Sequence, residues 1–252
     1  MSPSIRDFHR GDSEANCRQG ATLVAYIKRI VCLANSIKTG GTCVAGREVV
    51  SGRYGQWIRP VSARPAAEVS PSESRYNDQS TPKVLDIIDV PVLKPAPQHH
   101  QTENHVIDTT RRWVKVDELP WTGLAQLCEQ PASLWINSYR TRQGIFNCIS
   151  QEEAATLHNS LALIQPGGFA IRVGHSTWNG KSWKTYRGRF TYNGTSYVLV
   201  VTDPIVRKVF AHKAEGDYPV RDVYICVSLT EPAPQDGRCH KLVAAVMSNP
   251  PL

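Results

Sequence analysis

The sequence predicts a mainly β protein built from two small β-barrels that are joined by a short α-helical connector. The 252 residues include 17 glycines and 17 prolines, and this content implies many turns. The apolar runs are short and end at turn residues, as in 30–34 and 223–229, which is typical of strands. Asn193-Gly194 separates two such runs and predicts a β-hairpin.

The chain divides into four predicted segments. Residues 1–27 are polar and lack periodicity, so we expect a disordered tail or lead-in. Residues 28–119 form the first predicted barrel, 120–167 the helical connector and 168–252 the second barrel. In the connector, Ser150 and Glu153 form a capping-box pattern, which predicts a helix from Ser150 to about Leu163.

Charge and cysteine usage limit the classes of partner and compartment. The formal net charge of +7 is compatible with a polyanionic partner without requiring one. The seven cysteines are odd in number and form no C-x-x-C pair, so we expect reduced thiols and a cytoplasmic location. No apolar run approaches the ~18 residues of a membrane span, so no membrane partner is expected.

The most informative stretch for function is 172–190. It carries five cations and no acid, with aromatic residues between the cations. Aromatic rings can stack on bases while cations neutralise phosphates, which is how grooves for single-stranded nucleic acid work. The alternative is an exposed hairpin whose cations are only solvated. From this stretch we predict that nucleic acid is bound by Trp178, Lys181, Trp183, Lys184, Arg187 and Arg189.

A second basic and aromatic stretch lies at 30–64, in the first predicted barrel. Trp57 and Arg59 alternate onto one face of a predicted strand, and Lys38 and Arg47 precede them. We predict that these four residues also bind nucleic acid, single-stranded DNA or RNA being favoured over duplexes. The sequence leaves open whether the two basic surfaces form one groove.

Two other functions stay open. A nucleotide or modified base held near Asn35, Ser36, Arg59 and Asp203 would make the protein a small-ligand sensor. Exposed aromatic residues meeting a protein partner would make it an interaction scaffold.

Nothing in the sequence identifies an enzyme, and we predict no catalytic residues, cofactor or metal site. His99, His100, Glu103 and His105 lie close together but lack the spacing of a zinc motif, so we interpret 98–108 as a solvated loop.

Several motifs carry a resemblance to a known family. LANSIKTGGTCVAGRE, GQWIRPVSAR, TENHVID, VTDP, ICVSLTEP and HKLVAAV resemble a bacterial dual OB-fold-containing domain, over about residues 28–247. The resemblance implies two oligonucleotide/oligosaccharide-binding barrels in a bacterial protein from an anti-phage or mobile-element setting. It implies no catalytic residues. We therefore expect a non-catalytic module that binds or senses nucleic acid.

Overall fold

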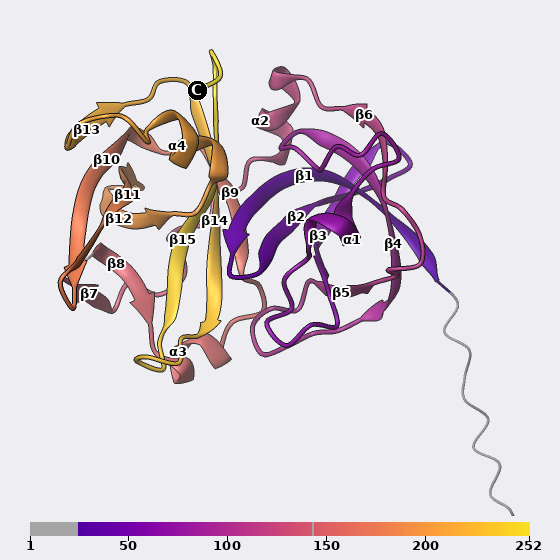
Figure 1. Cartoon of the computed structure of the whole chain (residues 1–252), viewed down its shortest axis with the longest axis horizontal. Coiled ribbons are helices and arrows are strands. Elements are labelled where there is room, and N and C mark those ends of the chain that lie inside the picture. Colours follow the sequence, from indigo (N-terminus) through magenta and orange to yellow (C-terminus); the bar gives the residue numbers. More distant parts are fainter. Residues whose placement is uncertain (1–24, 143) are drawn as a thin grey trace, which may run out of the picture.

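The computed structural model describes residues 25–142 and 144–252, and it shows two β-barrels side by side (Figure 1). The predicted mainly β architecture of two small barrels is confirmed. The predicted N-terminal tail lies outside the described residues up to position 24.

The first barrel is a closed sheet of five strands. Its order is β1-β2-β3-β5-β4, and it closes because β4 also pairs with β1. β1 is long enough for two neighbours, since its first half pairs with β4 and its second half with β2. β3 and β5 run parallel, whereas the other pairs are antiparallel. The strands are β1 (Tyr26–Lys38), β2 (Gly41–Val50), β3 (Arg53–Val61), β4 (Asp86–Pro95) and β5 (Asn104–Ile107), with β6 (Val114–Glu118) added beside β4.

The second barrel repeats this strand order with a divided first strand. β10, β11, β12, β15 and β14 follow in the same order, with β8 of the connector inserted in part between β12 and β15. β12 and β15 run parallel, as β3 and β5 do in the first barrel. β14 pairs with β9, which thus takes the place of the first half of β1. The strands are β9 (Leu161–Ile164), β10 (Gly167–Trp178), β11 (Lys181–Tyr192), β12 (Thr195–Val201), β14 (Val223–Pro232) and β15 (Cys239–Ser248), with β13 (Gly216–Pro219) beside β10.

Local chemistry explains the break and the hairpins of the second barrel. Pro166 lies between β9 and β10, where its missing N–H does not disturb a ladder. The predicted hairpin at Asn193-Gly194 is confirmed, and both residues have the positive φ of a tight hairpin turn, 45° and 75°.

The connector holds short helices and also strands. Its helical parts are η1 (Trp121–Gly123), α2 (Leu124–Leu127) and α3 (Gln151–Ala155), and its strands are β7 (Tyr139–Thr141) and β8 (Gly144–Ile149). The capping box at Ser150 and Glu153 is present as predicted. The helix ends at Ala155, however, so its predicted extension to Leu163 is wrong. Residues 161–164 are all buried and pair with β14, and such an apolar run fits a strand and a helix equally by periodicity.

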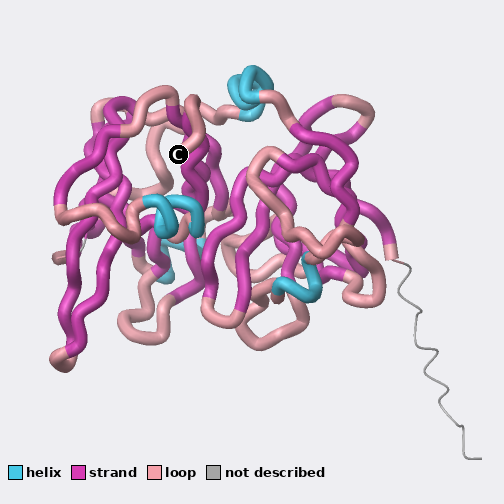
Figure 2. Tube along the Cα trace, turned by 45° about the horizontal axis from the view of Figure 1, so that its top comes forward, coloured by secondary structure: helices cyan, strands magenta, loops and turns pink. Residues whose placement is uncertain are grey.

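The remaining helices lie between the third and fourth strands of each barrel. α1 (Pro71–Ser74) has this place in the first barrel and α4 (Pro204–Val209) in the second. Figure 2 shows the described helices as short segments between the strands. None of the helices in the described part of the chain is long and apolar enough to cross a lipid bilayer.

The barrels meet at an apolar seam between β1–β3 of the first and β9, β14 and β15 of the second (Figure 1). Val31, Leu33 and Ala45 pack there with Leu163 and Met247. Each barrel also has a separate apolar core, so the seam holds together two units that are already packed. The segment boundaries at 28, 120 and 168 stay predictions.

Candidate nucleic-acid interface

A cleft of about 930 Å³ lies on the second barrel beside the β10–β11 hairpin. Four separate parts of the chain line it: β10, β11, the turn after β7 and the loop between β14 and β15. The lining residues are Arg142, His175, Ser176, Thr177, Trp183, Arg187 and Gln235. The cleft thus lies between the hairpin of the first two strands and the loop joining the last two, where OB barrels bind their ligands.

Strand alternation places the cleft residues on the outer side of β11. Phe190 of β11 is buried in the barrel core, so Trp183, Thr185 and Arg187, at odd positions, lie on the opposite face. Ser176 of β10 is paired with Trp183, and its small side chain leaves the indole open. The Trp183 side chain is therefore 48% exposed and offers a flat apolar surface to solvent.

Arg187 carries an uncompensated positive charge into this cleft. Its Nη1 donates a hydrogen bond of 3.1 Å to Thr185 Oγ1, while its buried Nε has no partner among the described residues. No carboxylate in the described part of the chain forms an ion pair with it. Burial and the guanidinium of Arg172, its cross-strand neighbour, lower the pKa of Arg187. A ligand phosphate would supply the missing counter-charge.

The other cations predicted on this hairpin differ in their surroundings. Arg189 forms an ion pair of 2.5 Å with Asp217 on β13, which Arg172 also contacts at 2.8 Å. Lys184 donates to the carbonyl oxygens of Ala211 and Lys213, so it holds the chain that follows α4.

The turn of the hairpin joins two further predicted residues. Lys181 is exposed at the start of β11 and pairs with Trp178 at the end of β10. The side chain of Trp178 lies outside the described part of the structure. On this hairpin, Trp183 and Arg187 are thus the predicted residues that line the cleft, with Lys181 at its turn.

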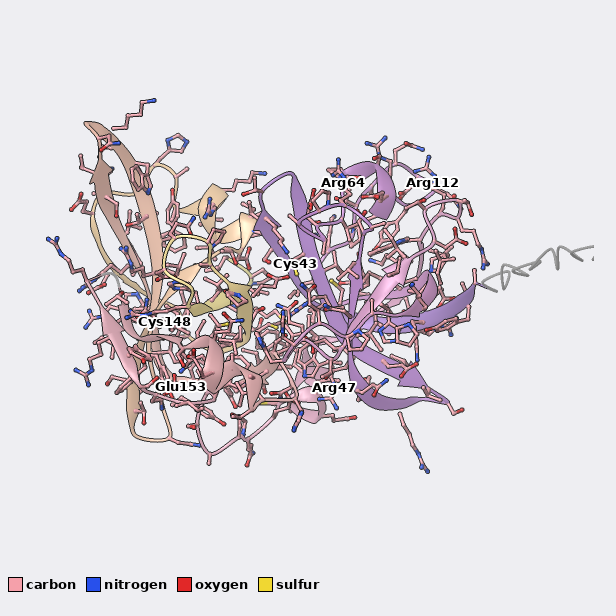
Figure 3. The ribbon with its side chains drawn as sticks, turned by 90° about the horizontal axis from the view of Figure 1, so that it is seen from below. Cys43, Arg47, Arg64, Arg112, Cys148 and Glu153 are labelled. Carbon is pink, nitrogen blue, oxygen red and sulfur yellow. The ribbon has the colours of Figure 1, made fainter. Side chains whose placement is uncertain are left out.

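In the first barrel, the predicted residues Arg47 and Trp57 are held by an acid of the connector. Arg47 forms an ion pair of 2.9 Å with Glu129, and the indole of Trp57 donates to both oxygens of the same carboxylate at 3.2 Å. The guanidinium also lies 5.8 Å from the Trp57 ring centroid. Trp57 is only 7% exposed, and Arg47 lies where the two barrels meet (Figure 3). Glu129 therefore occupies the position that a phosphate would need.

Arg59 and Lys38 link the two barrels. Arg59 is 3% exposed, and its Nη2 contacts Glu103 at 3.1 Å, Ser160 at 2.7 Å and Ser228 at 3.3 Å. Lys38 forms an ion pair of 3.4 Å with Glu231 of β14. β9, β14 and β15 lie between these residues and the β10–β11 hairpin (Figure 1), so the two predicted surfaces do not form one groove.

The residues of the predicted alternative pocket are only partly brought together. Ser36 and Arg59 line a cavity of about 110 Å³ between the barrels. Asn35 donates its amide to the carbonyl oxygen of Pro82 at 2.6 Å. Asp203 accepts hydrogen bonds from the backbone N–H groups of Ile205 and Val206, which caps α4, and from that of Val246.

The interpretation of 98–108 as a solvated loop was wrong. His100, Glu103 and His105 are buried, and His100 Nε2 lies 3.1 Å from the carbonyl oxygen of Thr230 in the second barrel. Gln101 likewise donates to the carbonyl oxygen of Leu229. The segment packs into the seam, where its polar groups find partners across the two barrels. No group of three metal-binding side chains is found within residues 25–142 and 144–252.

Sequence reasoning missed five cleft residues, namely Arg142, His175, Ser176, Thr177 and Gln235. Arg142 and Gln235 come from turns far along the chain from the hairpin, so no local pattern marks them. A signal did exist for Gln235: the loop between the last two strands of an OB barrel flanks the ligand face. His175 lay inside the basic stretch, and it forms a hydrogen bond with Glu215.

Comparisons with known proteins agree with this architecture. A family model described as a dual OB-containing domain matches residues 28–246. No curated protein matches the chain, and no solved structure does.

Proposed function

The chain belongs to the dual OB-containing domain family, and we propose on that premise that it binds single-stranded nucleic acid in the cleft of its second barrel. The observation that supports this most is the meeting of Trp183 and Arg187 in one cleft. The ring is half-exposed, and the guanidinium has no acidic partner among the described residues. A stacking surface beside an uncompensated cation suits an unpaired nucleotide.

In the proposed complex, one base stacks on Trp183 and an adjacent phosphate contacts Arg187. Arg142 at one rim and Lys181 at the hairpin turn contact the backbone on either side. Stacking on a tryptophan requires a base outside a duplex, which favours a single strand. The cations favour nucleic acid over an oligosaccharide, which carries no phosphate.

The proposed role is binding or sensing, without catalysis. A place in a bacterial anti-phage or mobile-element system belongs to the same proposal and rests on the family resemblance alone.

The test is fluorescence anisotropy with labelled single strands of DNA and RNA of ~12 nucleotides, within the usual range of OB-fold site sizes. Three phosphate contacts predict that the logarithm of the affinity falls with the logarithm of the salt concentration with a slope of about −2. Absence of salt-sensitive binding to either strand near ~50 mM salt, where phosphate contacts are strongest, would overturn the proposal.

A further inference from the structure

A smaller pocket of about 180 Å³ adjoins the cleft on the second barrel, and we call it the side pocket. It shares Ser176, Trp183 and Arg187 with the cleft. The rest of its lining comes from β11, from the end of β12 with Val201, and from α4 with Arg207. A ligand that lies in the cleft over Trp183 can therefore reach into the side pocket.

The side pocket exists because β11 is longer than its neighbour β12. The pairing of these two strands ends at Arg187 and Val200, so residues 181–186 of β11 have no partner strand on that side. The chain then turns from β12 into α4, which places Arg207 in the lining of the space that is left open. Lys184 donates two hydrogen bonds to backbone carbonyl groups after α4, and these fix the position of the helix beside β11.

The lining of the side pocket is positively charged. It contains Lys184, Arg187 and Arg207 and no carboxylate among the described residues. Arg207 forms no ion pair and no side-chain hydrogen bond in the part of the chain that the structure describes, so its charge, like that of Arg187, is uncompensated. The hydroxyl of Thr185 accepts from Arg187 and can still donate its own hydrogen. Two free guanidinium groups and a hydroxyl suit an anion with more than one negative charge.

The size of the side pocket limits how much of a nucleic acid it can hold. A cavity of ~150 Å³ holds a benzene molecule, so 180 Å³ has room for a phosphate group, which has fewer atoms. A further nucleotide, whose base alone is larger than benzene, does not fit beside that phosphate. The strand therefore ends in the side pocket.

We propose that the side pocket binds a terminal phosphate of the single strand whose base stacks on Trp183. Arg187 contacts this phosphate from β11 and Arg207 contacts it from α4, while the rest of the strand lies in the cleft. A phosphate monoester carries a charge of about −1.5 to −2 near neutral pH, more than a phosphate inside the strand, so two uncompensated arginines favour the end of a strand. This inference rests on the proposed function, because the cleft must hold the strand.

Competition anisotropy with the full chain provides the test. A labelled strand of ~12 nucleotides is displaced by unlabelled strands of the same sequence that carry a 5′-phosphate, a 3′-phosphate or no terminal phosphate. A phosphate at one end is expected to improve competition by about tenfold, the scale of one hydrogen bond to a charged group. The end that improves competition shows in which direction the strand lies. A methyl ester of that phosphate, which has a single charge, is expected to improve competition by less than about threefold.

Two variants of α4 assign the effect to the side pocket. Arg207→Gln is expected to reduce the improvement to about twofold or less, because the second guanidinium is lost. Lys208→Gln is the matched control: the residue is the next one along the same helix, is also exposed and lies outside the lining. This variant loses the same charge, and the tenfold improvement should remain.

The possible failures are distinguishable. Equal competition by strands with and without a terminal phosphate would overturn this inference and leave binding in the cleft intact. Absence of binding by every strand would overturn the proposed function and this inference together. An equal improvement by the methyl ester would show recognition of an ordinary phosphodiester, and an equal loss in the two variants would show a general charge effect of α4; each result would contradict a site for a terminal phosphate.

Discussion

Arg47 and Arg187 lie on corresponding strands, the second strand of each barrel, yet their surroundings differ. Arg47 and the neighbouring Trp57 face the seam and share the carboxylate of Glu129. Arg187 and the nearby Trp183 face solvent on the far side of the second barrel, with no ion pair to Arg187 among the described residues. Two barrels of one topology thus place similar side chains in an intramolecular contact and in an open cleft.

The difference teaches that a basic and aromatic cluster stays open to a phosphate ligand only where the chain itself supplies no acid. The predicted cations of the first barrel already have acidic partners from three parts of the chain. The ion pairs are Arg47–Glu129, Arg59–Glu103 and Lys38–Glu231. The cations of the two barrels can therefore be tested separately. Substitutions at the seam should change the free energy of unfolding, and substitutions in the cleft should change the affinity for an oligonucleotide.

The largest effect is expected at Arg59. Arg59→Met leaves Glu103 buried without its cation, and breaking a buried pair in this way costs about 3–5 kcal/mol of the free energy of unfolding. Denaturant titration measures the loss. Arg29→Met is the matched control, because the exposed Arg29–Asp89 pair contributes only ~0–1 kcal/mol. Equal losses in the two variants would contradict the role of Arg59 at the seam.

The next effect concerns Trp183. Trp183→Ala removes the proposed stacking surface and is expected to weaken oligonucleotide binding by about 1–3 kcal/mol in anisotropy titrations. Trp57→Phe removes the indole donor and part of the ring volume at the seam, and it should leave affinity unchanged. If Trp57→Phe weakens binding as much as Trp183→Ala, the two faces are not as different as the structure indicates.

Lys241 extends the comparison to a buried cation of the second barrel. It donates to the carbonyl oxygen of Ile136 and to Asn137 Oδ1, and burial lowers its pKa to about 7. In the unfolded chain this lysine has its ordinary pKa of ~10.4. Between pH 7 and that pKa, the unfolded chain keeps the proton that the folded chain releases, so the free energy of unfolding rises with pH. The expected rise is up to ~1.4 kcal/mol per pH unit.

Thermal or denaturant unfolding between pH 7 and ~8.5 measures this rise, below the pH at which unfolded thiols ionise. That limit matters because burial raises the pKa of Cys32 and Cys226, which lowers stability at higher pH. Lys241→Met should remove the rise. An unchanged pH profile in this variant would contradict the lowered pKa of Lys241.

The smallest effect separates two neighbours on β11. Arg187→Gln is expected to reduce the salt dependence of oligonucleotide binding by about 0.7 in the log–log slope, the loss of one phosphate contact to a single strand. Arg189→Gln should change the slope less, because Asp217 already neutralises Arg189. The opposite ranking would show that the ion pair opens to bind phosphate.

Much of the fold could be predicted from the sequence, because its signals are local. Asn193-Gly194 specifies its own turn, and the pattern of Ser150 and Glu153 specifies its own helix start. Residues 161–164 were misassigned because their strand pairs with β14, more than sixty residues later. The motifs of the family supplied the two-barrel architecture.

The candidate site was less predictable, because electrostatic partners come from distant parts of the chain. The stretch 172–190 contains no acid, yet Asp217 reaches Arg189 from β13. Arg47 and Glu129 are likewise separated by the whole of the first barrel after β2. Local charge counts could not show which cations stay unpaired.

The most direct test of the central claim is photo-crosslinking of a single-stranded oligonucleotide that carries 5-bromouracil, followed by peptide mapping. The difference between the two barrels predicts crosslinks in the β11 peptide that contains Trp183 and Arg187. Crosslinks confined to the β2–β3 segment with Arg47 and Trp57 would contradict it, because there Glu129 already fills the place of a phosphate.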